Sequence, residues 1–254
     1  MWWAGSERVV VYVGMGSAGV GPRAAEGDAP TKWLFAGSAV AAFEQVVQSL
    51  KDGTSQARRR CALDIQLSGA LARPFMFEAV DGLKTWKEAL EVAATLAPDA
   101  TGLPGPCAVW LDDWVRGQRC VAVAIDVVLR DRIEQIARDD GLRIATLRPW
   151  WAVATDAAVA SLVGSVQLLS VEDTDSMTVF TSASGVGYAA LATYAPKPAP
   201  GQARAVVTRA AMAANLQSGD IASAWLGQPI TQADDSPDVD RAAPSLVPRV
   251  GRWM

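Results

Sequence analysis

The chain has 254 residues, half of them apolar, which is enough for one large α/β domain or two lobes with a sizeable core. Its formal charge of −4 argues against nucleic-acid binding, because phosphate contacts need clustered Lys and Arg. Histidine is absent, which excludes Ser-His-Asp and Cys-His catalysis and Cys/His zinc sites. There is no apolar run of transmembrane length and no secretory signal pattern. We therefore expect a cytoplasmic protein that a partner could hold at the inner membrane.

The N-terminal part of the sequence predicts strands followed by a helix. Residues 9–13 and 33–35 are apolar runs typical of strands, and a loop rich in Gly and Pro separates them. Ser38 is a suitable N-cap, and Gly53 is placed to end the helix that follows. Apolar residues recur at helical spacing between these two limits: Val40, Phe43, Val47 and Leu50.

The next strand signal is the strict alternation over residues 63–68. Leu63, Ile65 and Leu67 alternate with polar residues, which predicts a strand with one face on a core. Pro74, shortly after it, indicates either that strand pairing breaks there or that the strand lies at a sheet edge.

The middle of the chain is predicted to run in the order helix, hairpin, helix, strand, helix. Asp126 is expected to cap the second of these helices, Gly141 to end it, and Pro149 to open the last one. The segments are 86–97, then 107–111 with 119–125, then 126–141, 143–147 and 149–160.

The character changes after residue 165 to a β-meander. Strands are expected at 166–171, 177–181 and 186–194, followed by an Ala-rich helix at 203–217. Residues 228–254 hold four prolines and few apolar residues, which predicts an irregular tail. The expected organisation is a first lobe over 1–160, a smaller second lobe over 161–227 and the tail.

Gly14-Met15-Gly16-Ser17-Ala18-Gly19 matches the GxGxxG dinucleotide fingerprint directly after an apolar strand. The fingerprint also requires a helix whose N-terminus meets the pyrophosphate, but here the sequence continues with Val20-Gly21-Pro22. We therefore interpret this stretch as a glycine-rich hairpin turn, and a phosphate site on Gly14, Gly16 and Gly19 is kept as the alternative.

No other motif predicts a catalytic or metal site. Ser68 has no Lys close by in sequence and is interpreted as a strand-end hydroxyl. Acidic residues occur as adjacent pairs, whose side chains point in different directions, so neither a metal nor a cofactor is expected.

Leu67-Ser68-Gly69-Ala70-Leu71-Ala72-Arg73 is similar to a strand of the actin-like cytoplasmic scaffolds of type II secretion and type IV pilus assembly, GspL and PilM. In these families a strand begins with Leu-Ser and an Arg follows five residues after the Ser. The resemblance extends over residues 60–165, through a helix, a pair of strands ending in Val123-Ala124-Ile125-Asp126, an amphipathic helix and a strand running into Pro149.

The resemblance implies an α/β, actin-like (ribonuclease H-like) fold with mixed sheets flanked by helices. Actin-fold ATPases carry carboxylates in two glycine hairpins that serve phosphate and magnesium. We align these hairpins with Tyr12-Val13-Gly14 and with Thr181-Ser182-Ala183-Ser184-Gly185, neither of which holds a carboxylate. A pseudo-ATPase that has lost nucleotide hydrolysis is therefore expected. The chain also lacks the membrane helix of the secretion component and is shorter than the pilus component.

The leading functional hypothesis is a non-enzymatic cytoplasmic scaffold that binds the cytoplasmic segment of an inner-membrane assembly protein. A secretion or pilus ATPase is a further partner that the resemblance implies, and a homodimer is a further possibility. The resemblance places the binding in a groove between lobes or on a sheet edge. Arg73, Arg148 and Trp151 are the candidate partner-binding residues. The alternatives are a nucleotide-binding actin-like or Rossmann-like enzyme that uses Gly14–Gly19 loop residues, and a self-assembling structural subunit.

Overall fold

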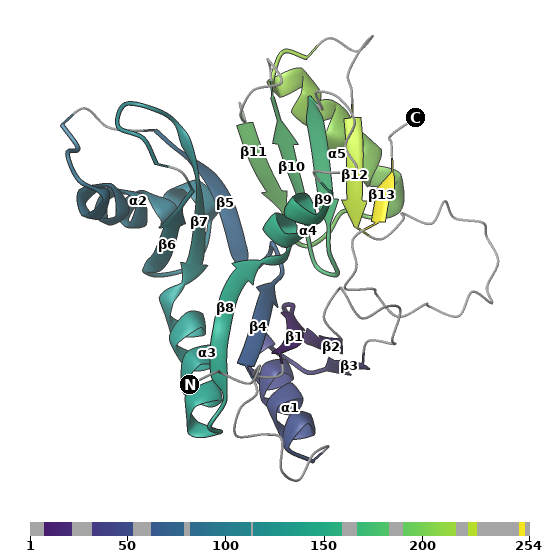
Figure 1. The fold of residues 1–254 in the computed structure, drawn as a ribbon. Coiled ribbons are helices and arrows are strands. Elements are labelled where there is room, and N and C mark those ends of the chain that lie inside the picture. Colours follow the sequence, from purple (N-terminus) through teal and green to yellow (C-terminus); the bar gives the residue numbers. More distant parts are fainter. Residues whose placement is uncertain are drawn as a thin grey trace.

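The computed structural model describes nine segments of the chain, and the elements within them form two halves and one inserted unit (Figure 1). The described segments are residues 8–21, 32–52, 62–78, 82–112, 114–158, 167–182, 190–216, 223–227 and 249–251.

The first half is built on a five-stranded mixed sheet in the order β3-β2-β1-β4-β8. Its first three strands form an antiparallel meander, and a helix then leads to β4, which is parallel to β1. The last strand, β8, is parallel to β4. The elements are β1 (Arg8–Val13), β2 (Ser17–Gly21), β3 (Lys32–Phe35), α1 (Ala39–Asp52), β4 (Ala62–Leu67) and β8 (Arg143–Pro149).

The second half repeats this pattern in a sheet of order β11-β10-β9-β12-β13. Three antiparallel strands again form a meander, and a helix again leads to a strand parallel to the first, here β12 beside β9. The elements are β9 (Leu168–Glu172), β10 (Met177–Thr181), β11 (Ala190–Tyr194), α5 (Pro200–Ala213), β12 (Ser223–Gly227) and β13 (Arg249–Gly251).

The first four strands have the same order and directions in both halves, with the first strand at the centre of each sheet, although the fifth strand is parallel in the first sheet and antiparallel in the second. This repeat makes the fold actin-like, and the predicted fold class is confirmed. The strand β13 lies within the predicted irregular tail and pairs antiparallel with β12. The predicted boundary between the lobes, at residues 160 and 161, lies outside the described residues.

A separate unit is inserted between β4 and α3 (Val127–Asp139). It is a three-stranded sheet in the order β5-β7-β6, with α2 packed on one face through a small apolar core. Thr85 caps α2 with a reciprocal Thr85–Glu88 capping box. The elements are β5 (Ala72–Phe77), α2 (Trp86–Thr101), β6 (Cys107–Leu111) and β7 (Cys120–Asp126).

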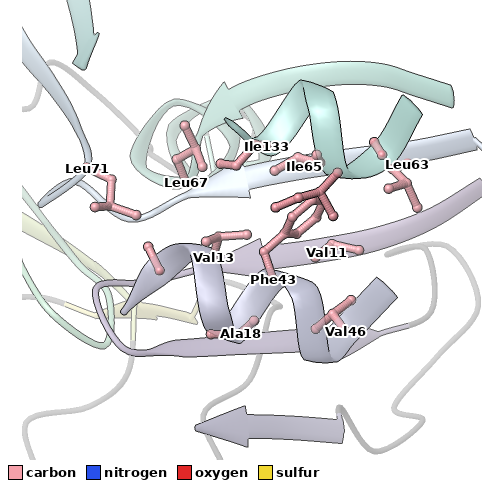
Figure 2. Close-up of a cluster of buried hydrophobic side chains, with 14 of the residues drawn as sticks. Val11, Val13, Ala18, Phe43, Val46, Leu63, Ile65, Leu67, Leu71 and Ile133 are labelled. Carbon is pink, nitrogen blue, oxygen red and sulfur yellow. The ribbon is translucent and has the colours of Figure 1, made fainter. Parts of the chain in front are cut away.

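The largest apolar core lies between the first sheet and helices α1 and α3. Figure 2 shows Phe43 of α1 lying among side chains of β1 and β4, close to Val11 and Ile65. The alternation predicted for β4 is confirmed, since Leu63, Ile65 and Leu67 are fully buried while the polar residues between them are partly exposed. Period-two burial therefore fixes the register of β4, the strand that leads to Ser68.

The two halves meet through a second core, which involves α4 (Trp150–Ala158). Trp151 packs against Phe180 of β10 with ring centroids 5.3 Å apart, and its indole Nε1 donates to the Ala72 carbonyl at 3.0 Å. Tyr12 of β1 lies in the same core and contacts Trp33. Aromatic packing of this kind joins the two halves and the start of the inserted unit.

Several local predictions are confirmed. Ser38 accepts a hydrogen bond from the Ala41 N–H at the start of α1, and Asp126 accepts one from Val128 at the start of α3. Gly141 has a φ of +70° just beyond α3, which is the left-handed conformation expected of a C′ glycine. The hairpin of β6 and β7 forms as predicted.

Other local predictions are wrong or incomplete. Pro149 ends β8, where it pairs with Leu67, and the predicted helix begins at the next residue as α4 (Trp150–Ala158). Strands β2, β5 and β12 were not predicted from sequence. The edge position that Pro74 suggested for the strand over 63–68 is wrong, because that strand is β4 and lies between β1 and β8, while Pro74 belongs to β5, an outer strand of another sheet.

Candidate functional site

The functional interest of the fold lies where the two halves meet. The turn between β9 and β10, residues 172–176, is here called the acidic hairpin because it carries Glu172, Asp173 and Asp175. It lies against two turns of the first half: the glycine turn, residues 14–16 between β1 and β2, and the turn that follows β4 at Ser68 and Gly69. We call this contact region the junction.

Asp173 is the most heavily bonded side chain of the junction, and it is 7% exposed. Its carboxylate accepts hydrogen bonds from the first half, from the Gly69 N–H at 2.7 Å and from the fully buried Ser68 hydroxyl at 3.0 Å. Within the hairpin it also accepts from the N–H groups of Asp175 and Ser176 and from the Ser176 hydroxyl. One carboxylate therefore satisfies five donors from two halves of the molecule.

Asp175 and Thr174 extend the same contact toward β1. The Asp175 carboxylate accepts from the Met15 N–H at 2.8 Å, so it binds the backbone of the glycine turn. The Thr174 hydroxyl lies 2.7 Å from the hydroxyl of Tyr12, which is 1% exposed. The three successive residues Asp173, Thr174 and Asp175 thus all bond to the first half.

Lys197 supplies the positive charge at the base of the acidic hairpin. Its ammonium lies 3.2 Å from the buried Glu172 carboxylate and donates to the Asp173 carbonyl at 3.0 Å. Its own N–H donates to the Asp175 carbonyl. A buried carboxylate needs such a partner, and Lys197 fastens the hairpin within its own half.

Two glycines allow the halves to approach this closely. A Cβ added to Gly69 would lie 2.6 Å from the Ser176 hydroxyl and 2.9 Å from that of Thr178. A Cβ added to Gly14 would overlap the Asp175 carboxylate. A side chain at either position would displace the side chains that make the contact between the acidic hairpin and the first half.

Burial sets the ionisation properties of the junction. It raises the pKa of Asp173, although the hydrogen bonds from Gly69, Asp175 and Ser176 oppose this shift. Burial, followed by the negative charges of Asp173 and Asp175, raises the pKa of Tyr12 well above its usual value. Tyr12 therefore stays a neutral phenol that can donate or accept a hydrogen bond.

The acidic hairpin corrects the sequence prediction about the carboxylates. The glycine turn joins the first two strands of its meander, and the corresponding turn in the second half joins β9 and β10. The stretch 181–185, which we had aligned with it, instead follows β10, and residues 183–185 lie outside the described residues. The turn opposite Gly14 therefore does carry carboxylates, and the signal for them was the repeat of strand order between the two halves.

The interpretation of the GxGxxG stretch as a hairpin turn is confirmed. The Gly14 N–H donates to the Ser17 carbonyl at 2.7 Å, and the chain continues directly into β2. Gly16 accepts from the Ala36 N–H, and Gly19 pairs with Tyr12 and Trp33 inside the sheet. The three glycines thus belong to a strand hairpin and do not lead into a helix.

The junction does not fit the nucleotide that an actin-like fold implies. Phosphate groups bind to backbone N–H donors, and here the Met15 and Gly69 donors are bonded to the carboxylates of Asp175 and Asp173. Within the described segments, no three Asp, Glu or Cys side chains gather closely enough to hold a metal ion.

The three predicted partner-binding residues occupy different environments. Trp151 is 7% exposed and belongs to the core between the halves. Arg148 at the end of β8 has a side chain that is 51% exposed and lies 3.5 Å from Asp156 of α4. Arg73 is half-buried on β5, and its guanidinium donates to the carbonyls of Thr101 at 2.7 Å and Ala70 at 3.2 Å. Their role in binding stays a prediction.

Of these three residues, Arg73 lines a surface groove between the inserted unit and the second half. The groove has a volume of about 450 Å³, and we call it the β5–β11 groove after the two strands on its sides. The end of α2 completes its wall at Ala100 and Thr101, and Glu78 and Arg119 form an ion pair at its rim. Figure 1 shows the two strands facing each other as the outer strands of separate sheets.

Comparison with known proteins returns similar structures but no similar sequences. No protein-family model matches the chain, and no curated protein matches it significantly. The cytoplasmic domain of EpsL, an inner-membrane component of the type II secretion system of Vibrio cholerae, is 11% identical, with 85% of this chain and 80% of that chain covered and a TM-score of 0.49.

Two further solved structures are similar to a comparable degree. The PilM-PilN type IV pilus biogenesis complex is 14% identical, with 83% of this chain and 66% of that chain covered and a TM-score of 0.48. A Bacteroides thetaiotaomicron protein with an actin-like ATPase fold is 10% identical, with 84% and 79% covered and a TM-score of 0.49.

Among the helices that the structure describes, none combines the length and the apolar character needed to cross a membrane.

Proposed function

We propose that this protein is a non-enzymatic actin-like scaffold that binds a cytoplasmic segment of an inner-membrane assembly protein. The observation that carries the proposal is the junction, where Asp173 and Asp175 bond to the backbone N–H groups of Gly69 and Met15. These donors face the space between the two halves, and the protein's own carboxylates already satisfy them. An actin-like fold with this junction works as a rigid framework.

The choice of partner follows from the sequence resemblance described for residues 67–73 and the segments after them. Scaffolds of that kind serve pilus or secretion assembly platforms, and they act by binding other components. We propose that this chain lies in the cytoplasm and is held at the inner membrane by its partner. Binding of the secretion or pilus ATPase and formation of a homodimer are further proposals of the same resemblance.

The nucleotide-binding alternative needs a rearranged junction. Phosphate could reach Met15 and Gly69 only after the acidic hairpin had moved away, which would break the hydrogen bonds of Asp173 and Asp175 and expose Tyr12. Substituting Gly16 would not test this alternative, because an added Cβ would lie 2.9 Å from the Ala36 carbonyl and would disturb the hairpin itself. A direct binding measurement is therefore required.

The test is a fluorescence titration of the full chain with Mg·ATP, combined with a phosphate-release assay. Trp150 and Trp151 lie in the core between the halves and would report a rearrangement there. We expect no saturable signal and no hydrolysis. Tight, magnesium-dependent binding would overturn the non-enzymatic proposal.

The scaffold role is tested by co-expressing the protein with inner-membrane pilus or secretion proteins encoded by neighbouring genes. We expect one of them to co-purify with it through its cytoplasmic segment, and deletion of that segment should abolish the complex. If none co-purifies, the proposed partner class is wrong.

A further inference from the structure

The exposed side of α5 differs from the other helix surfaces in its charge. α5 packs with its buried side on the second sheet, on the sheet face opposite α4 (Figure 1). Its exposed side carries Arg204 and Arg209, and the helix contains no Asp or Glu. The stretch without acidic residues is longer than the helix and spans residues 176–219, although the whole chain has 27 Asp and Glu.

Helices α1, α2 and α3 instead carry both signs of charge and pair them. Arg132 of α3 lies 2.8 Å from Glu44 of α1, and α2 has an internal pair of a lysine and a glutamate four residues apart. Arg204 and Arg209 are both exposed, and neither makes an ion pair with a described residue. The described part of the chain therefore provides no counter-charge for these two guanidinium groups.

The surface around the two arginines is slightly hollowed, with a volume of about 540 Å³. We call this surface the α5 face; its residues are Gly201, Arg204, Ala205, Thr208, Arg209 and Met212. Arginine is weakly hydrated and can bind a phosphate group through two parallel hydrogen bonds. Met212 is 68% exposed, and an apolar side chain beside basic residues can enter the boundary between lipid headgroups and acyl chains. The α5 face therefore combines the two features by which a surface helix contacts a membrane.

We infer that the α5 face lies on the anionic phospholipid surface of the inner membrane, with Arg204 and Arg209 bound to headgroup phosphates. The choice of a membrane rests on the proposed scaffold function, which places the chain at the inner membrane through a partner. Charge favours this occupant over a second copy of the chain, because two α5 faces would bring arginines against arginines. The formal charge of the whole chain is −4, so an anionic surface repels most of the protein and favours the approach of this basic face.

A contact through two arginines is weak and has a limited role. Each basic residue close to an anionic membrane raises the partition onto it by about fivefold, so the pair contributes about thirtyfold. Such a contact does not anchor a protein alone, but it adds to the binding of a partner that already holds the protein at the membrane. The α5 face thus sets the orientation of the scaffold, with the second half toward the membrane.

The test is sedimentation of the full chain with excess vesicles at low salt. The vesicles consist of phosphatidylcholine, either alone or mixed with an equal amount of phosphatidylglycerol. We expect binding to the mixed vesicles, which decreases as the salt concentration rises, and no binding to phosphatidylcholine alone. Equal binding to the two kinds of vesicle, or no binding to either, would overturn the inference.

Protein variants assign the binding to the α5 face. Arg204→Gln and Arg209→Gln should each lower the partition coefficient about fivefold, and the double variant about thirtyfold. Both side chains are exposed, so the variants should fold, and circular dichroism checks this. Arg132→Gln is the matched control, because it removes the same charge from an exposed position on another helix, and it should change the partition by less than about twofold. Equal losses in the control and in the α5 variants would contradict the assignment.

Two further measurements distinguish other occupants of the α5 face. A dimer in sedimentation velocity without lipid that the double variant dissociates would assign the face to a second copy and overturn the inference. Loss of the co-purified membrane protein from the double variant in detergent would assign the face to a protein partner, with the same consequence. Vesicle binding needs no protein partner, so failure of the co-purification itself would count against the proposed function and not against the lipid contact.

Discussion

The junction and the β5–β11 groove both lie between separately folded parts of the chain, but they treat their polar groups in opposite ways. At the junction, backbone N–H groups of the first half are bonded to carboxylates of the second half, in a buried contact at Gly69 and in an exposed one at Met15. The β5–β11 groove is instead a surface feature, lined by Arg73 of β5, by β11 and by the exposed ion pair of Glu78 and Arg119. The junction joins the two halves of the protein, and the groove is suited to bind a partner.

This difference indicates which polar groups of such a fold can determine the specificity of partner binding. Buried polar groups that satisfy one another fix a single arrangement, and a partner cannot reach them. Polar groups at a surface groove cost little free energy while water solvates them, and they can form hydrogen bonds with a partner on binding. We therefore expect substitutions at the junction to change stability and substitutions in the groove to change binding.

The largest expected effect is that of Asp173→Ala. Removing this carboxylate leaves the N–H groups of Gly69, Asp175 and Ser176 buried without an acceptor. Each such loss costs about 1–3 kcal/mol, so we expect a total of about 3–5 kcal/mol in the free energy of unfolding, measured by urea denaturation. Asp139→Ala, at an exposed position of α3, is the control and should change stability by less than about 0.5 kcal/mol. Equal effects in the two variants would show that the junction is not the tight contact described.

A smaller but clear effect is expected for Gly69→Ala. The new methyl group would meet the hydroxyls of Ser176 and Thr178 and would push the halves apart, at a cost of about 1–3 kcal/mol. Gly37→Ala is the matched control, because nothing lies within 4 Å of its added Cβ. Thermal unfolding of both variants against the parent chain checks the prediction. Unchanged stability of Gly69→Ala would mean that the halves can separate freely there.

The pH dependence of stability tests the buried phenol of Tyr12. The pKa of Tyr12 is raised in the folded state. Its contribution to the free energy of unfolding is therefore complete below the unfolded pKa of 10.0, and it is lost as the pH rises from there through the folded pKa. The unfolding free energy should fall above pH 10.0 by up to about 1.4 kcal/mol per pH unit from this group. Tyr12→Phe should show a weaker decline over the same range. Parallel curves for the two proteins would place Tyr12 in a solvated environment.

The smallest expected effect belongs to the groove. Arg119→Gln removes the rim pair with Glu78, whose side chains are 58% and 63% exposed, respectively. Surface ion pairs contribute little, so the change in unfolding free energy should stay below about 0.5 kcal/mol in the same urea measurement. A loss as large as that of Gly69→Ala would mean that the groove is a structural contact and would erase the contrast between the two regions.

The sequence predicted those features that local patterns control. The alternation of Leu63, Ile65 and Leu67 predicted a half-buried strand, and Asp126 predicted a helix start, because burial period and capping act within a few residues. The actin-like fold class could also be predicted, from the resemblance of residues 60–165 to known families of actin-like scaffolds.

The sequence did not predict the features that depend on pairing between distant segments. β2 has the sequence Ser-Ala-Gly-Val-Gly, which has little strand propensity, and it forms a strand because it lies between β1 and β3. The acidic hairpin was interpreted as a simple turn. The hairpin contacts Gly69, which lies more than a hundred residues earlier in the sequence, so this contact depends on how the two halves pack against each other.

The same limit explains why the candidate site changed. Arg73, Arg148 and Trp151 were chosen without knowledge of burial, and the structure places Trp151 in a core and Arg148 on an open surface. Of the three, Arg73 lines the groove, and its half-buried position depends on α2, which is inserted after it in the chain.

The most direct test of the closed junction is an NMR titration of the full chain with Mg·ATP that follows the backbone amide signals of Met15 and Gly69. These N–H groups are bonded to Asp175 and Asp173, so we predict that neither signal moves and that the buried Gly69 amide exchanges slowly with solvent. A saturable shift of both signals on addition of Mg·ATP would show that phosphate reaches these donors, and it would contradict the account of a scaffold closed by its own carboxylates.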